Sequence, residues 1–219
     1  MDGFDLLILG FMLSLISGDL GLTTGQAGSL VTWTLVGAVI GGFIFGTLSD
    51  KFGRVRVLTW TIVLFAVFTG LCAFAQGYWD LLIYRTIAGI GLGGEFGIGM
   101  ALAAEAWPAQ HRAKATSYVA IGWQLGVLAA ALLTPVLLPY IGWRGMFMVG
   151  IIPAFVAWIF RAKLHEPEIF VQSKETKEHS HTNSFKLLVK DVRTTKTSIG
   201  VAVLTSVPVS YTHLTLPTK

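Results

Sequence analysis

The stretch Arg85-Thr-Ile-Ala-Gly89-Ile-Gly-Leu-Gly93-Gly94-Glu95-Phe-Gly97-Ile-Gly99 places an arginine and a glutamate inside an apolar, glycine-rich segment of membrane-spanning length. Charged side chains inside a spanning helix are costly and usually functional. Gly89, Gly93 and Gly97 recur every four residues, so they would let a neighbouring helix backbone approach closely. The segment also contains G-x-G-x-x-G, but no predicted strand precedes it, so a dinucleotide site is rejected. We therefore predict a membrane helix with a glycine packing face and two functional charges.

The composition of the whole chain also indicates a membrane protein. Apolar residues make up 53% and charged residues 13% of the 219 positions, and the mean hydropathy is +0.68. Such a chain has too few polar residues to cover the surface of a soluble domain. The net charge of +4 comes from basic connections between apolar spans, so it does not require a nucleic-acid partner.

Apolar stretches of two lengths occur along the chain. Five of them reach the length of roughly 17 to 20 residues that a spanning helix needs: 28–48, 55–74, 79–104, 115–140 and 143–160. Two others, 4–17 and 199–209, are too short to cross. We therefore expect an all-α membrane protein. Its first helix would be truncated, with Met1 internal to a longer natural chain.

The basic residues predict the orientation of the spans. Most of the 16 Lys and Arg residues stand in the connections 49–56, 105–114 and 161–198, whereas the connections 18–26 and 76–79 carry none. By the positive-inside rule the first set is cytoplasmic. The chain is therefore predicted to be a multi-pass protein of the plasma membrane, which is the inner membrane in a bacterium.

The spans and connections divide the chain into four parts. Residues 1–160 form the membrane part, 161–198 a polar cytoplasmic linker, and 199–209 the start of a seventh helix. Residues 210–219 cannot complete that helix, and we expect them to be a non-native tail.

A weak internal repeat groups the first six spans by threes. Gly37 and Gly41 in the second span have counterparts of the same spacing, Gly122 and Gly126, in the fifth. Inverted repeats of three helices are typical of one half of a transporter, where the first and fourth helices line a shared site near the midplane. The repeat therefore favours a transporter.

The connection after the second span reads Gly46-Thr-Leu-Ser-Asp50-Lys51-Phe-Gly53-Arg54-Val-Arg56. It resembles the loop signature G-x-L-x-D-[RK]-x-G-[RK] of the major facilitator superfamily. Gly46 would permit close helix contact and Gly53 a tight turn, and Asp50 and Arg54 can form an ion pair at the membrane face. The resemblance implies the N-terminal six-helix half of that fold, built from two inverted three-helix repeats. The C-terminal half of the same chain would then be missing.

Other segments resemble the same family. Arg85-x-x-x-Gly89-x-Gly91 is similar to its R-x-x-x-G-x-G element, whose arginine is associated with proton coupling. Glu105-Ala-Trp-Pro108-Ala-Gln-His-Arg112 resembles the charged segment that follows. Within the family, Asp2-Gly-Phe-Asp5 and Gly94-Glu95-Phe96-Gly97 look most like the sialate:proton and aromatic-acid:proton symporters. The resemblance implies proton-coupled symport of a small organic acid anion, such as a sugar acid, a sialate-like acid or an aromatic carboxylate.

The ionisable residues inside the spans supply the candidate site. Asp2, Asp5 and Glu95 are the proton-coupling candidates, because an acid removed from water can bind and release a proton. Arg85, Glu95 and Gln124 are the substrate-binding candidates, since an arginine keeps its charge and offers a planar fork to a carboxylate. A static ion pair is the alternative for Arg85, with Asp2 as the favoured structural partner.

Two alternatives to this function stay open on the sequence. A sugar or other metabolite transporter of the same superfamily is one alternative, and a non-transporting membrane sensor or scaffold is another. An enzyme is not expected, because the spans contain no evident nucleophile–base set, and no cofactor is implied. His179 and His181 lack further ligands, so no metal site is predicted. The expected partners are an organic anion, a proton, the lipid bilayer and the missing C-terminal half.

Overall fold

The computed structural model describes residues 2–161, except for the side chains of Asp2, Ala109, Trp158, Phe160 and Arg161. The linker predicted up to residue 198, the predicted seventh helix at 199–209 and the predicted tail at 210–219 lie outside the described residues.

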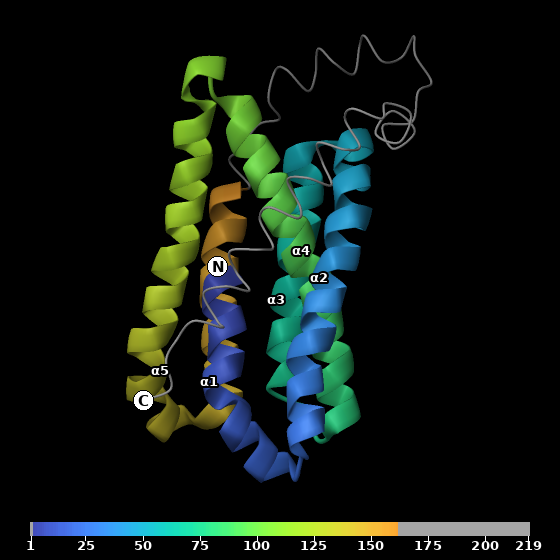
Figure 1. Cartoon of the computed structure of the whole chain (residues 1–219), viewed down its shortest axis with the longest axis vertical. Helices are drawn as coiled ribbons and strands as arrows, with labels where there is room; N and C mark the ends of the chain where they lie inside the picture. Colours follow the sequence, from blue (N-terminus) through green and yellow to red (C-terminus); the bar gives the residue numbers. More distant parts are fainter. Residues whose placement is uncertain (1, 162–219) are drawn as a thin grey trace, which may run out of the picture. The chain divides into compact units, whose positions relative to one another are not determined.

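Every secondary-structure element in the described part is a helix (Figure 1). In chain order they are α1 Asp2–Leu20, α2 Thr24–Phe52, α3 Arg54–Cys72, α4 Tyr78–Ala106, the 3-10 turn η1 Ala109–His111, and α5 Arg112–Arg161. Five of these helices are long and apolar enough to cross a membrane, with α5 counted once. The all-α membrane architecture is confirmed.

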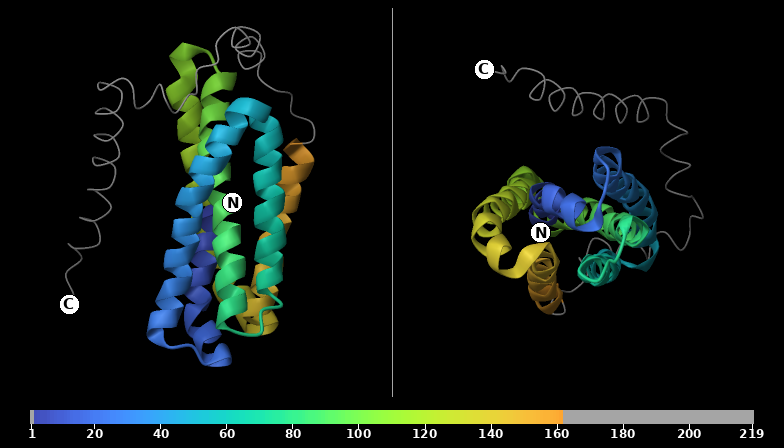
Figure 2. Two further views of the ribbon diagram at one scale, coloured as in Figure 1. Left: turned by 90° about the vertical axis from the view of Figure 1, so that its right-hand side faces the viewer. Right: turned by 90° about the horizontal axis from the view of Figure 1, so that it is seen from below.

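The helix α5 consists of two arms that meet at Gly142. This residue has φ 63° and ψ −179°, a conformation that interrupts the helix and that glycine adopts without strain. Figures 1 and 2 show the chain reversing there, so that the first arm (residues 112–141) and the second arm (143–161) run side by side in opposite directions. The predicted boundary between the spans 115–140 and 143–160 is confirmed.

The helix α1 is longer than the sequence predicts. The apolar stretch 4–17 was expected to be too short to cross, but the helix has 19 residues because residues 2–3 precede that stretch and residues 18–20 continue it. Asp19 is tolerated there since its carboxylate is paired with Arg144. Residues 3–20 are long and apolar enough to span a membrane, so the prediction that this segment is too short is wrong.

Glycines bring the backbones of α2 and α4 into contact. A Cβ added at Gly37 or Gly41 of α2, or at Gly89 or Gly93 of α4, would collide with a backbone carbonyl of the other helix. The packing role predicted for Gly89 and Gly93 is confirmed. At Gly97 an added Cβ would meet no described atom within 4 Å, so the prediction is wrong for that residue. The two helices therefore form one tightly packed pair.

Larger apolar side chains pack α1 against α5. The main buried cluster joins one face of α1, including Ile8, Met12 and Ile16, to Met146 and Phe147 of the second arm. The helix α3 packs against both α4 and α5. This arrangement leaves the opposite side of α1 facing α2, α4 and the first arm of α5, where the candidate site lies.

Candidate functional site

A buried ion pair joins α1 to α4. Nη1 of Arg85 lies 2.8 Å from Oδ2 of Asp5 and donates a hydrogen bond to Oδ1 at 3.1 Å. Arg85 is 0% exposed and Asp5 is 2% exposed. Either charge alone would be strongly unfavourable at this depth, so each stabilises the other. Sequence reasoning favoured Asp2 as the structural partner of Arg85, but the residue that occupies that place is Asp5.

The Arg85 guanidinium is enclosed by side chains from three helices. Besides Asp5 of α1, the neutral Cys72 thiol of α3 lies near it, and its Cζ lies 5.7 Å from the ring centroid of Phe147 in the second arm of α5. The Cys72 thiol itself donates to the Phe68 carbonyl oxygen at 3.2 Å. Nε and Nη2 of Arg85 have no hydrogen-bond partner among the described residues. A fully buried cation is thus balanced by a single described carboxylate.

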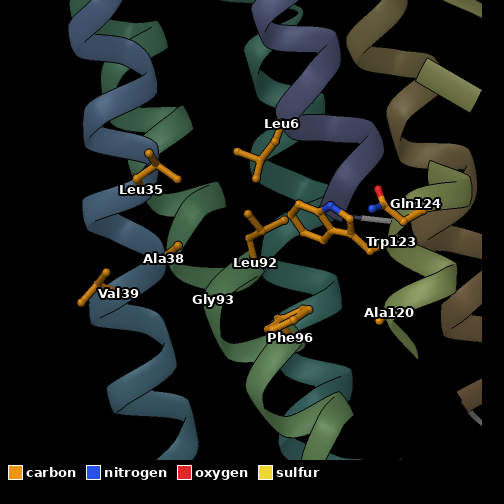
Figure 3. Close-up of a pocket in the computed structure, with 10 residues that line it drawn as sticks. All are labelled: Leu6, Leu35, Ala38, Val39, Leu92, Gly93, Phe96, Ala120, Trp123 and Gln124. Atoms are coloured by element: carbon orange, nitrogen blue, oxygen red, sulfur yellow. The ribbon is translucent and has the colours of Figure 1, made fainter. Parts of the chain in front are cut away.

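A cavity of about 600 Å³ lies between α1, α2, α4 and the first arm of α5 (Figure 3). Its walls are almost entirely apolar, with Leu6 from α1 and Leu92 from α4 among them. Trp123 supplies an indole N–H, and Gln124 supplies the one side-chain amide in this lining. The cavity can therefore hold an apolar body and offer few hydrogen bonds.

Two aromatic side chains meet at the cavity wall. The ring centroids of Phe96 and Trp123 are 5.9 Å apart, and their planes are inclined at 75°, an edge-to-face arrangement. They come from α4 and from the first arm of α5 (Figure 3). Sequence reasoning missed this pair as a site feature. The sequence offers one weak signal for this pair. Each aromatic residue adjoins a polar candidate in an apolar span, since Phe96 follows Glu95 and Trp123 precedes Gln124.

The predicted substrate-binding residues do not all reach the cavity. Gln124 lines it, whereas Arg85 and Glu95 are absent from the described lining. Arg85 is fully buried beside Asp5, and Glu95 is partly buried. Leu6, which directly follows Asp5 on α1, does line the cavity. The ion pair and the cavity thus share one stretch of α1 but are separate in this conformation.

A second charged cluster lies on the predicted cytoplasmic side. Nη1 of Arg54 lies 2.8 Å from Oδ1 of Asp50 and donates to Oγ of Ser49 at 2.8 Å. Its Nη2 and Nε donate to the two carboxylate oxygens of Glu105 at 3.0 and 3.3 Å. The predicted ion pair between Asp50 and Arg54 is confirmed. Glu105, predicted in a separate motif with Arg112, belongs to this same cluster.

The other residues of the two charged motifs, 46–56 and 105–112, have different surroundings. Gly53 has φ 107° between α2 and α3, so the predicted tight turn is confirmed. A Cβ at Gly46 would meet no described atom within 4 Å, so the predicted close helix contact there is wrong within the described part. Lys51, Arg56 and Arg112 are exposed.

A third cluster, which sequence reasoning missed, lies at the opposite end of the helices. Asp19 accepts hydrogen bonds from Nε1 of Trp143 at 3.0 Å and from Nη1 of Arg144 at 2.7 Å. Nη2 of Arg144 donates to the Ala75 carbonyl oxygen at 3.3 Å. The guanidinium also lies 4.1 Å from the Trp143 ring centroid. This outer cluster of Asp19, Ala75, Trp143 and Arg144 ties the end of α1 to the start of the second arm of α5 and to the connection between α3 and α4.

Potential metal ligands are sparse in the described part. Residues 2–161 contain no group of three or more His, Cys, Asp or Glu side chains that could hold a metal ion. His179 and His181 lie outside the described residues.

Comparison with known proteins gives consistent matches along the chain. The sequence model described as Major Facilitator Superfamily matches residues 1–218. A Haemophilus influenzae protein named "Putative metabolite transport protein" is 76% identical over 94% of this chain and 52% of that protein. The cis,cis-muconate transport protein of Acinetobacter baylyi is 34% identical over 88% of this chain and 48% of its own length. The sialic acid transporter NanX of Escherichia coli is 31% identical over 84% and 46%. The chain spans about half the length of these relatives.

The fold matches that of a solved membrane transporter. The partially occluded, inward-open structure of the xylose transporter XylE from Escherichia coli aligns with a TM-score of 0.67, covering 81% of this chain and 48% of that chain. The two sequences are 24% identical in this alignment, so the likeness bears on the arrangement of the helices alone.

Proposed function

Because this chain belongs to the Major Facilitator Superfamily, a family of integral membrane transporters and not of enzymes, we propose that the full-length protein carries out proton-coupled symport of a small organic acid anion. The observation that carries this proposal is the buried pair of Asp5 and Arg85, which lies on the same helices as an apolar cavity. The substrate would be a small organic acid with a largely apolar or conjugated body.

Asp5 is the proposed proton carrier. Its charge is stabilised inside the protein by the Arg85 guanidinium, at 2.8 Å. If α1 moves relative to α4, the carboxylate loses that cation, and a proton can take its place. Return of the guanidinium would expel the proton. Asp5 is the preferred candidate because the cation that pairs with it belongs to another helix, so a relative movement of α1 and α4 would change its surroundings.

Arg85 is the proposed partner of the substrate anion. Protonation of Asp5 would leave a buried guanidinium that cannot lose its own proton. An organic carboxylate could then restore charge balance, for which the Nε and Nη2 edge of Arg85 has the matching geometry. Proton and anion would thus each make the binding of the other more favourable, which is the requirement for symport. This step needs a movement of α1 that opens the Arg85 guanidinium to the cavity.

The cavity wall supports an organic acid over a neutral sugar. Phe96 and Trp123 offer aromatic surface, and Gln124 can donate a hydrogen bond to a carboxylate. A sugar would bury several hydroxyl groups, each of which costs free energy without a partner. The names of the relatives that transport cis,cis-muconate and sialic acid agree with an acid substrate.

The family also suggests how the rest of the transporter is built. The chain would be the N-terminal six-helix half, made of two inverted three-helix repeats, and a C-terminal half would close the cavity. The packing supports such a repeat. Glycines bring α2 against α4, while Gly3 and Gly126 bring α1 against the first arm of α5.

The proposal is tested in proteoliposomes that contain the full-length protein. With an inwardly directed proton gradient, labelled benzoate, cis,cis-muconate and N-acetylneuraminate are offered separately, and labelled xylose serves as the neutral control. Accumulation of at least one acid, abolished by a protonophore and not seen for xylose, is expected. Uptake of xylose alone, or acid uptake that ignores the gradient, would contradict the proposal.

A further inference from the structure

Phe147 is the aromatic residue that lies against the buried Arg85 guanidinium. The Cζ atom of Arg85 is 5.7 Å from the centroid of the Phe147 ring, within the range of a cation–π interaction. Phe147 is 0% exposed and projects from the second arm of α5. It therefore approaches the guanidinium from a different helix than Asp5 does.

The orientation of this ring is fixed by the outer cluster. The rings of Trp143 and Phe147 meet edge to face, with centroids 6.1 Å apart and an interplanar angle of 89°. The Trp143 indole N–H is held by Asp19 at 3.0 Å, and Arg144 covers the Trp143 ring at 4.1 Å. Phe147 therefore packs against a ring that the outer cluster holds in place.

The aromatic ring matters most when Asp5 carries a proton. Around the guanidinium, the titratable groups in the described part are Asp5 from α1 and Cys72 from α3, and the second arm of α5 contributes a ring in place of a charge. Neutral Asp5 would leave the cation without a described counter-ion. A desolvated cation over an aromatic face gains more than an exposed one does, so the ring offsets part of that cost.

We propose that Phe147 is a positioning residue for proton coupling, whose ring holds the Arg85 guanidinium in place while Asp5 is protonated. This inference rests on the proposed role of the Asp5–Arg85 pair. Without the ring, protonation of Asp5 would leave a less stable cation, so the proton-loaded state would form less readily. Steps that do not require the proton to leave and return would be affected much less.

The test uses the full-length protein and two transport measurements. One is accumulation driven by a proton gradient, and the other is counterflow, in which substrate exchanges without net proton movement. Phe147→Leu removes the aromatic face, Phe147→Tyr retains it, and Phe65→Leu is the matched control. Phe65 is also almost fully buried, at 1% exposure, but packs against Ala88 and Leu92. The substrate in both measurements is a labelled acid that the unmutated full-length protein accumulates in the proteoliposome test of the proposed function.

The expected result is a change in the ratio of the two measurements. For Phe147→Leu, the ratio of driven accumulation to counterflow should fall about tenfold, as expected for loss of a desolvated cation–π contact. For Phe147→Tyr and Phe65→Leu it should stay within about twofold of the parent ratio. A loss of packing alone lowers both activities together, so equal ratios for Phe147→Leu and Phe65→Leu would overturn the inference.

Two further variants separate this inference from the proposed function. If Asp5→Asn still accumulates substrate against a gradient, the proposed proton carrier is wrong. If Asp5→Asn fails but Phe147→Leu behaves like Phe65→Leu, the positioning role alone is wrong.

Thermal unfolding in detergent provides a measurement without substrate. Phe147→Leu should lower the Tm less in an Asp5→Asn/Arg85→Met background than in the parent, and an equal loss would rule out the contact with the cation.

Discussion

Asp5 contacts Arg85 through one guanidinium nitrogen, Nη1, with its two carboxylate oxygens at 2.8 and 3.1 Å. The Nε and Nη2 edge, which is the edge suited to a bidentate contact with a carboxylate, has no hydrogen-bond partner among the described residues. The pair therefore combines a carboxylate that a proton can neutralise with an arginine edge that can still donate hydrogen bonds to an anion.

Asp5→Asn should uncouple transport from the proton gradient. The amide has nearly the size of the carboxylic acid but cannot take up the proton, so driven accumulation should be lost while counterflow persists. The two activities are measured side by side in proteoliposomes. Glu95→Gln is the comparison, since it makes the same kind of chemical change at Glu95 of α4, which the sequence also proposes as a proton carrier. If Asp5→Asn accumulates substrate fully and Glu95→Gln does not, the proton carrier is Glu95 and not Asp5.

Arg85→Lys should weaken substrate binding. The ammonium keeps the charge and can still pair with Asp5, but it lacks the planar fork that matches a carboxylate. The loss of one charge-assisted hydrogen bond corresponds to roughly a tenfold fall in apparent affinity. Half-saturation of counterflow measures this value. If the affinity is unchanged, Arg85 is a structural partner of Asp5 and does not bind the substrate.

The glycine contacts between α2 and α4 predict a sharp contrast between two alanine variants. A Cβ at Gly41 would collide with the carbonyl of Ile90, whereas one at Gly97 would meet open space among the described residues. Gly41→Ala should therefore destabilise the protein by roughly 1–3 kcal/mol, a usual cost of overpacking. Gly97→Ala should be neutral or slightly stabilising, because alanine favours helix. Unfolding followed by intrinsic fluorescence in detergent distinguishes them, and similar midpoints for both variants would contradict the packing.

The features that the sequence predicted well are local ones. Span boundaries follow from the length of apolar stretches, and the ion pair between Asp50 and Arg54 follows from their spacing of four residues within one signature. The break between the predicted spans 115–140 and 143–160 also agrees with the non-helical residue Gly142. Each of these inferences needed only neighbouring residues.

The features that the sequence missed depend on how helices rotate against one another. A rise of about 1.5 Å per residue estimates the depth of a side chain, but it does not say which helix the side chain faces. Depth therefore could not decide whether Asp2 or Asp5 would meet Arg85. The contact between Asp19 and Arg144 joins residues 125 positions apart, with no motif to relate them. Packing alone determines these contacts.

Gln124→Leu should lower the affinity for an acid substrate without preventing folding. Gln124 is exposed and supplies the one side-chain amide in the described lining of the cavity, while leucine has a similar size and suits the apolar wall. A hydrogen bond to a charged group contributes roughly 1.5–3 kcal/mol, so half-saturation of counterflow should rise about tenfold or more. Gln76→Leu is the matched control, because Gln76 is exposed in the connection between α3 and α4, away from this cavity. An unchanged half-saturation value in Gln124→Leu would mean that the substrate carboxylate is bound elsewhere, and the proposed role of this cavity wall would have to be abandoned.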